Sequence, residues 1–254
     1  MFNTWVLSVN TNEHLVERKL RVVEEISQHP VVADRRFPVS NELKSWARDE
    51  VFSALRGKPL RTVVFHTGAS EPNFKAWPLP KFIELGRWLV NNCDAAVMLV
   101  GSAEEETMCQ PLVEALGDRI ASFLGCTIEQ TAAVIEQCAL FVGSDSGPIH
   151  LAASVGTPGV GLYGPTNYVR TRPYGSANRV LRMEFSCSPC WCAIYDWERF
   201  VRLTSQRLRC SPAKCLQALE VDLVFAACVA FLNAERMASS DLCQDATEHK
   251  ERVP

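Results

Sequence analysis

The densest set of chemically useful side chains lies at 143–150, at the end of an apolar segment. Pro148 suits the first turn of a helix, and Ser146 and Gly147 just before it would present backbone N–H groups that favour an anion. Asp145 and His150 are polar groups beside apolar segments and need partners there. The alternative is an ordinary Ser/Asp helix cap with a hydrogen-bonded histidine. No Gly-x-Ser-x-Gly turn is present, so Ser146 is not predicted to be a nucleophile.

A second polar loop follows the apolar run 62–65. It reads His66-Thr67-Gly68-Ala69-Ser70 and leads to Lys75-Ala76-Trp77-Pro78. Small residues let backbone N–H groups approach a phosphate, and Lys75 can neutralise the phosphate charge. Because no full glycine-rich fingerprint is present, the alternative is a plain turn followed by a surface lysine.

A third loop carries three consecutive acids, Glu104 to Glu106, after an apolar run that ends at Gly101. A carboxylate at such a position can accept hydrogen bonds from ribose hydroxyls, as acidic residues do in dinucleotide sites. Acids in the first turn of a helix also stabilise the helix dipole, and this is the alternative interpretation.

Eleven cysteines are many for a chain of 254 residues. A C-x2-C…C-x4-C pattern near the C-terminus could supply four thiolates to a structural zinc ion. Its members are Cys187, Cys190, Cys210 and Cys215. A disulfide or redox pair and free thiols are the alternatives. Cysteines in apolar segments are predicted to be small buried hydrophobic residues, namely Cys93, Cys109, Cys126 and Cys138.

The polar loops need a scaffold that brings them together. Apolar patterning predicts six strands, at 62–65, 95–100, 119–123, 139–143, 158–163 and 180–183. It predicts helices at 13–27, 41–55, 79–91, 104–116, 128–138 and 148–155, and a C-terminal helix around 223–232. Alternating strands and helices predict a parallel sheet in a Rossmann-like, doubly wound α/β fold. Ligands of such sheets bind beyond the carboxyl ends of the strands, where all three loops fall.

Composition narrows the class of protein. Hydrophobic residues make up 47% of the chain and charged residues 22%, as in globular proteins, and the net charge is −3. We therefore expect no general affinity for nucleic acid or an anionic membrane. The longest apolar run, 223–232, is about half of the roughly 20 residues that span a bilayer. The N-terminus carries no export signal, so a cytoplasmic location is expected.

Taken in order, these motifs resemble the C-terminal half of the glycosyltransferase family 9 heptosyltransferases. The resemblance covers 62–222 and rests on the motifs 66–70, 75–78, Gly101 with Glu105, 145–152, and 156–158 with 163–166. It implies a GT-B architecture, in which two Rossmann-like domains face each other across a cleft. It also implies an inverting, metal-independent transfer of heptose from ADP-heptose to the lipopolysaccharide core.

The resemblance implies a donor site of eight residues: Thr67, Ser70, Lys75, Glu105, Asp145, Ser146, Gly147 and His150. Ser70 and Lys75 would contact the diphosphate, and Glu105 would contact the ribose. The segment 145–147 would line the phosphate and the sugar, with His150 supporting it.

The chain begins close to the segment that joins the two domains in this family. We expect 1–60 to be a helical interdomain remnant, 61–235 the nucleotide-sugar-binding domain and 236–254 a polar tail. The catalytic base and the acceptor site would lie in the missing domain, so this chain alone is expected to bind donor without transferring sugar. Peripheral contact with the inner membrane is left open. The alternatives are a family member that uses another nucleotide sugar and a non-catalytic nucleotide-binding module.

Overall fold

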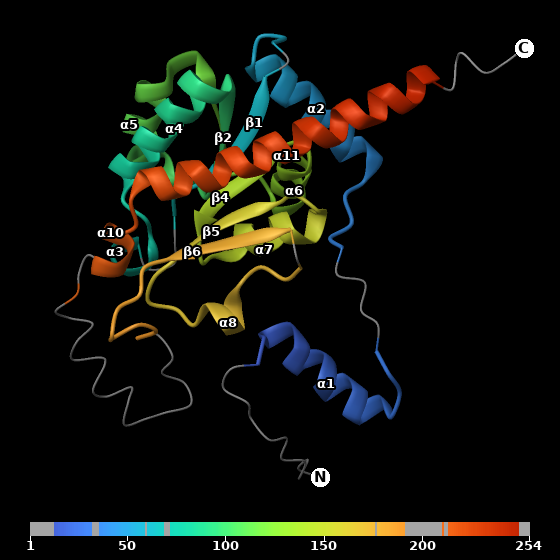
Figure 1. Ribbon diagram of the computed structural model, residues 1–254, viewed down its shortest axis with the longest axis vertical. Coiled ribbons are helices and arrows are strands. Elements are labelled where there is room, and N and C mark those ends of the chain that lie inside the picture. Colours follow the sequence, from blue (N-terminus) through green and yellow to red (C-terminus); the bar gives the residue numbers. More distant parts are fainter. Residues whose placement is uncertain are drawn as a thin grey trace, which may run out of the picture.

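One parallel sheet organises the chain (Figure 1). The computed structural model describes residues 13–31, 36–58, 60–68, 72–175, 177–190, 210 and 213–248. The strands are β1 (Arg61–His66), β2 (Ala95–Gly101), β3 (Ile120–Leu124), β4 (Leu140–Ser144), β5 (Gly159–Tyr163) and β6 (Asn178–Arg182). Their order is β3-β2-β1-β4-β5-β6, and every neighbouring pair is parallel. This is the doubly wound order of Rossmann-like folds, so the predicted fold class is confirmed.

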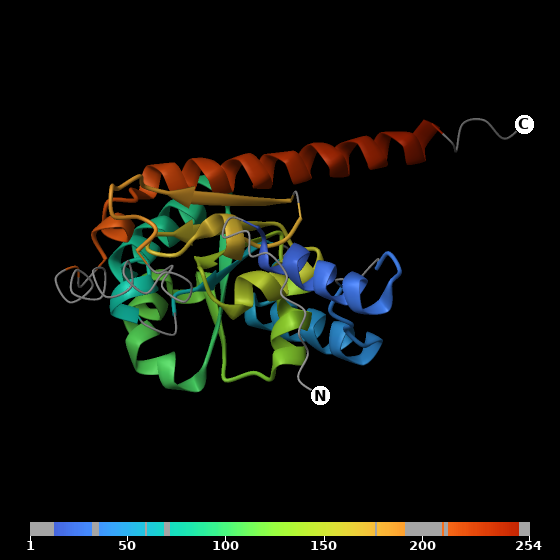
Figure 2. The same ribbon diagram turned by 90° about the horizontal axis from the view of Figure 1, so that it is seen from below.

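Helices cover both faces of the sheet. One face packs against α4 (Leu79–Cys93), α5 (Glu106–Leu116) and α11 (Val221–Glu248). The other packs against α2 (Asn41–Ala54), α6 (Ile128–Glu136) and α7 (Gly147–Val155), and Figure 2 shows α11 and α2 on opposite sides. Neighbouring strand residues alternate between the two cores, with Val63 and Phe65 in the first and Val64 in the second. Burial on both faces explains why these strands are continuous apolar runs.

The sheet order places distant loops side by side. β1 pairs with β2 on one side and with β4 on the other, with His66 opposite Gly143 at the end of the ladder. The order of strands reverses between β1 and β4, and the crevice at such a reversal is where doubly wound sheets bind ligands. All three polar loops of the sequence follow strands β1, β2 and β4.

Short elements complete the loops and were not predicted. They are α3 (Pro72–Lys75), the 3-10 turns η1 (Ala103–Glu105) and η2 (Gly117–Arg119), α8 (Tyr168–Thr171) and α10 (Lys214–Gln217). The predicted helix at 104–116 therefore divides into η1 and α5. The helix that follows β3 is capped by Thr127, whose Oγ1 accepts the Gln130 N–H at 3.2 Å.

Helix α1 (Leu15–Ser27) lies apart from the sheet, beside α8 (Figures 1 and 2). It has no buried residue. Its cap His14 accepts the Val16 N–H at Nδ1, and His14 Nε2 lies 2.8 Å from the Arg172 carbonyl oxygen. The tautomer with a proton on Nε2 satisfies both contacts, so His14 joins α1 to the loop after α8.

The predicted domain limits stay predictions. α11 continues as one helix through the limit that we placed at residue 235. Across the part of the chain that the structure describes, every helix is too short or too polar to cross a lipid bilayer.

Candidate functional site

A pocket of about 600 Å³ lies at the ends of β1, β2 and β4. Its wall combines polar and apolar side chains from the loops after these strands and from α6 and α7. The lining residues are His66, Gly101, Ser102, Glu105, Cys126, Ile128, Thr131, Gly147, Pro148, His150, Leu151 and Ser154. The pocket therefore occupies the crevice that the strand order predicts.

Glu105 is the most unusual group in this pocket. It stands in η1, where Ser102 N and Ser102 Oγ each make a long contact of 3.5 Å with its Oε1. These contacts form a capping box, so one oxygen of this acid has a structural role at the start of η1. The other oxygen, Oε2, is buried and has no hydrogen-bond partner among the described residues. Such an oxygen is costly unless a ligand supplies a donor.

Two glycines make room for the Glu105 carboxylate. A Cβ on Gly68 would lie 2.4 Å from Glu105 Oε1, and a Cβ on Gly101 would lie 2.6 Å from Oε2. Any larger residue at either position would displace the carboxylate from the crevice. Burial raises the pKa of Glu105 above its ordinary value, because the ionised form loses hydration.

His66 connects the two sides of the pocket, and the sequence analysis assigned it no role in the site. Its Nδ1 shares a hydrogen bond of 3.1 Å with Ser146 Oγ, and its Nε2 lies 4.0 Å from Glu105 Oε1. The side chain is buried, and burial lowers its pKa to about 4. His66 is therefore neutral at physiological pH, and its hydrogen bond to Ser146 joins the end of β1 to the loop after β4. The sequence did contain one signal for this role, because His66 is a polar residue directly after the apolar run of β1.

The start of α7 faces open space. Pro148 lies in its first turn, as predicted, and Ser146 is an N-cap in extended conformation. A Cβ on Gly147 would meet no atom within 4 Å. The first N–H groups of a helix have no partner inside the helix, so this end of the pocket suits an anionic group.

Asp145 is held by the protein itself. Thr171 Oγ1 of α8 donates to its Oδ2 at 3.0 Å, and His150 Nε2 lies 3.9 Å from its Oδ1. Tyr163 at the end of β5 donates its hydroxyl proton to the Thr171 carbonyl at 2.8 Å. The bond from Thr171 fixes the Asp145 carboxylate beside the start of α7, and the supporting role of His150 stays a prediction.

Asp145 and Ser146 do not line the pocket themselves, and neither do two further predicted site residues, Thr67 and Lys75. Thr67 is buried and its Oγ1 bonds Cys109 Sγ at 3.2 Å, so its side chain is already used inside the core. Lys75 is half-buried at the end of α3. Ser70 lies outside the described residues. Trp77, two residues after Lys75, donates its backbone N–H to Ser144 Oγ at 3.2 Å, which ties the lysine's segment to the end of β4.

An apolar wall closes the pocket opposite the polar groups. It consists of Cys126, Ile128 and Leu151, from the loop before α6, from α6 and from α7. We predicted Cys126 and Cys93 to be buried, and this was wrong, because both are only half-buried. Cys126 is partly exposed because it lies in a loop, and loops run over the surface even where the next helix is apolar. Cys109 and Cys138 are buried, as predicted.

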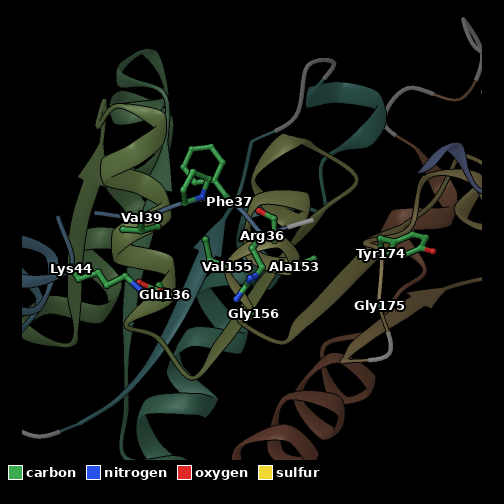
Figure 3. A pocket seen from close by; sticks show the side chains of 12 residues that line it. Arg36, Phe37, Val39, Lys44, Glu136, Ala153, Val155, Gly156, Tyr174 and Gly175 are labelled. Atoms are coloured by element: carbon green, nitrogen blue, oxygen red, sulfur yellow. Dashed lines mark hydrogen bonds and ion pairs between the residues drawn. The ribbon is translucent and has the colours of Figure 1, made fainter. Parts of the chain in front are cut away.

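A second pocket, of about 730 Å³, shares the lining residue Ser154 with the first. Figure 3 shows its lining, with the Lys44–Glu136 ion pair at one end and Tyr174 at the other. The Phe37 N–H donates to the Ser154 carbonyl at 3.0 Å, which binds the segment before α2 to the end of α7. None of the predicted site residues lines this pocket.

The four cysteines predicted as zinc ligands are free thiols in the structure. Cys187 is exposed, Cys190 and Cys210 are half-buried, and Cys215 is buried. Within the described ranges, no three His, Cys, Asp or Glu side chains are arranged to hold a metal ion.

Comparison with known proteins relates this site to one family. The family model described as glycosyltransferase family 9 (heptosyltransferase) matches residues 1–194. Lipopolysaccharide heptosyltransferase 2 of Salmonella typhimurium is 33% identical over 137 residues, which cover 52% of this chain and 38% of that protein. The chain spans about two fifths of the length of the curated relatives that it matches.

Solved structures share the fold. A glycosyl transferase family 9 protein from Veillonella parvula superposes with a TM-score of 0.74 at 21% identity, over 90% of this chain and 62% of that one. The E. coli heptosyltransferase WaaC, solved with ADP, gives 0.51 at 19% identity, over 79% of this chain and 59% of that one. Since the family model covers well over half of the sequence, the chain belongs to glycosyltransferase family 9, the heptosyltransferase family.

Proposed function

We propose that the 600 Å³ pocket binds the sugar donor of a heptosyl transfer, ADP-heptose. The observation that carries the proposal is the buried Oε2 of Glu105, which has no hydrogen-bond donor among the described residues. A ribose presents two neighbouring hydroxyls, and these are the donors that such a carboxylate lacks. Membership of the heptosyltransferase family and the WaaC structure solved with ADP support adenosine diphosphate as the nucleotide.

Each part of the donor has a chemically matched wall. The adenine would lie against the apolar wall of Cys126, Ile128 and Leu151, and the ribose would bind Glu105. The diphosphate would face the open N–H groups at the start of α7, with Lys75 as its counter-charge. Asp145, fixed by Thr171, would accept hydrogen bonds from sugar hydroxyls, because a carboxylate is repelled by phosphate.

The same groups would assist departure of the nucleotide. When the bond between the sugar and the diphosphate breaks, negative charge grows on the leaving phosphate. The fixed N–H groups at the start of α7 would stabilise that charge without reorganising, and Lys75 would add its positive charge. Transfer to the lipopolysaccharide core with inversion, independence of metal and a cytoplasmic location are proposed from family membership.

Calorimetry with ADP, adenosine and UDP tests the donor site. Wild-type protein should bind ADP more tightly than UDP. Lys75→Ala removes a charge-assisted contact of roughly 1.5–3 kcal/mol, so ADP affinity should fall about 10- to 150-fold while adenosine binding is unchanged. Glu105→Ala should weaken both ligands, because both contain the ribose.

Lys58→Ala is the matched control, since Lys58 is exposed and makes only a 3.9 Å surface contact with Asp118. It should bind ADP like wild type. Folded wild-type protein that binds no ADP would reject the proposal. The same holds if Lys75→Ala and Glu105→Ala both bind ADP with unchanged affinity.

A further inference from the structure

Two polar side chains face each other where β1 and β2 end, namely His66 and Glu105, and both line the 600 Å³ pocket. His66 Nε2 lies 4.0 Å from Glu105 Oε1, with the His66 side chain 7% exposed and that of Glu105 20% exposed. Water therefore competes little for either group. At 4.0 Å the two atoms are too far apart to share a direct hydrogen bond. The position of the protons decides what this corner of the pocket offers to a ligand.

The proton on the His66 ring can be placed from its other nitrogen. Ser146 Oγ lies 3.1 Å from His66 Nδ1 and 3.1 Å from the Ser144 carbonyl oxygen. A hydroxyl has one proton to donate and a carbonyl can only accept. Both contacts are satisfied when the hydroxyl donates to Ser144 and Nδ1–H donates to the hydroxyl. Because burial lowers the pKa of His66 to about 4, the ring carries one proton at physiological pH, and Nε2 has none.

The end of β4 fixes the His66 ring in this orientation. The ladder sets His66 opposite Gly143, and a Cβ on Gly143 would lie 3.3 Å from His66 Cβ. Glycine at 143 therefore leaves the strand end that carries the ring undisturbed. Ser146 is the N-cap of α7, yet its side chain makes no capping hydrogen bond. Its hydroxyl is turned to His66 instead, so the N–H groups of α7 stay available.

His66 Nε2 is thus an acceptor that lies beside a second acceptor. Glu105 Oε2 is buried and has no hydrogen-bond partner among the described residues. In the same part of the chain, the contact that the structure gives to Nε2 is the long one with Glu105 Oε1. Buried acceptors without a donor cost free energy until a ligand supplies one. A ligand with hydroxyls on two neighbouring carbons would supply a donor to each group.

We propose that His66 Nε2 accepts a hydrogen bond from one ribose hydroxyl of the nucleotide, while Glu105 accepts a hydrogen bond from the other. The inference rests on the proposed donor site, because it takes the ribose to lie in this pocket. It makes the site selective for ribonucleotides. A 2′-deoxy or 3′-deoxy analogue would leave one of the two acceptors unpaired, and sites that bind a hydroxyl in this way reject the analogue that lacks it.

NMR of the protein without ligand tests the position of the proton. In the ¹⁵N-labelled chain at pH 7, the His66 ring should show a protonated Nδ1 and an unprotonated Nε2. Ser146→Ala removes the hydroxyl that accepts from Nδ1–H, so the proton should move towards Nε2 in this variant. A wild-type ring that carries its proton on Nε2 would overturn the inference, whether or not the protein binds ADP.

Calorimetry with ADP, 2′-deoxy-ADP and 3′-deoxy-ADP tests the contact itself. Wild-type protein should bind ADP about 10- to 100-fold more tightly than either analogue. His66→Asn keeps an amide near the position of Nδ1 but has no atom at the position of Nε2. Its preference for ADP over one of the two analogues should fall to about twofold, while its preference over the other is kept. Glu105→Ala should reverse the two results.

His29→Asn is the matched control, because His29 is exposed, and it should show the wild-type preferences. Folded wild-type protein that binds no ADP would reject the donor site and this inference with it. Wild-type protein that binds ADP and both analogues equally would overturn this inference alone. The same conclusion follows if His66→Asn keeps the wild-type preference over both analogues. If His66→Asn fails to fold, the wild-type tautomer and the wild-type analogue affinities still decide.

Discussion

The two carboxylates beside the proposed donor pocket differ in their hydrogen-bond partners. On the β4 side, Asp145 accepts a hydrogen bond from the Thr171 hydroxyl and has His150 nearby. On the β2 side, Glu105 keeps a buried oxygen without a partner in the described part of the chain. The protein thus satisfies one carboxylate itself and leaves one oxygen of the other without a donor among the described residues. Both carboxylates lie in a loop directly after a strand, so their place in the fold does not distinguish them. They differ in whether the protein supplies a hydrogen-bond donor.

His66 lies between these two sides, and its protonation should have the largest effect on them. The native side chain is neutral, with a pKa near 4, whereas in the unfolded chain its ordinary pKa is 6.5. The unfolded state therefore takes up a proton first, and stability falls as pH decreases from about 6.5 to 4. The difference between these two pKa values corresponds to roughly 3 kcal/mol of unfolding free energy.

Urea unfolding between pH 7.5 and 4 measures this loss. His66→Gln should show a smaller loss than wild type, while His29→Gln, at an exposed position, should show the full loss. If His66→Gln and wild type lose stability in parallel, His66 is not buried as a neutral group.

The second largest effect is expected for Asp145→Ala, which should distinguish contacts to the sugar from contacts to the nucleotide. Asp145→Ala should cost ADP-heptose about 1–3 kcal/mol of binding free energy, through lost contacts to sugar hydroxyls. ADP should bind as before or slightly better, because a negative charge beside the diphosphate is gone. Calorimetry with both ligands gives the difference. His150→Ala should lower Tm and weaken both ligands together. An equal loss for both ligands in a stable Asp145→Ala protein would reduce Asp145 to a loop-shaping residue.

The smallest effect is expected for Glu105, the carboxylate with one oxygen that lacks a hydrogen-bond partner among the described residues. Since burial raises the pKa of Glu105, the native state keeps its proton at pH values where the unfolded chain has lost it. Stability should therefore fall as pH rises from the ordinary pKa of glutamate through the raised native value. Glu105→Gln lacks this decrease, so its Tm relative to wild type should rise over that interval. ADP should reduce the difference by satisfying the carboxylate. A constant difference in Tm between pH 4 and 8 would contradict this.

The fold was readable from the sequence because strands covered on both faces are continuous apolar runs. The runs around Val64, Met98 and Phe141 each became a central strand. For the site, the sequence predicted only which loops carry it, namely the loops that follow the strands. Glu105 and Asp145 were found in this way, but their partners were not. Thr171 belongs to a helix of four residues, which is too short to show periodicity.

Contacts between distant segments account for the rest. His66 gains its importance from Ser146, which is 80 positions away in the chain. Thr67 resembled a ligand residue, yet its hydroxyl is bonded to Cys109 inside the core. Neither pairing has a local signature, because each depends on which strands become neighbours.

The pairing of β1 with β4 also has a consequence for the order in which the molecule can fold. β1, β2 and β3 are consecutive in the chain and can form a half-sheet as soon as they have been synthesised. The bond between His66 and Ser146 must wait for β4, and closing so long a loop carries an entropic cost before any contact is gained. Donor binding should therefore be one of the last properties that a newly made chain acquires. A donor present during refolding would favour the completed sheet over the half-sheet.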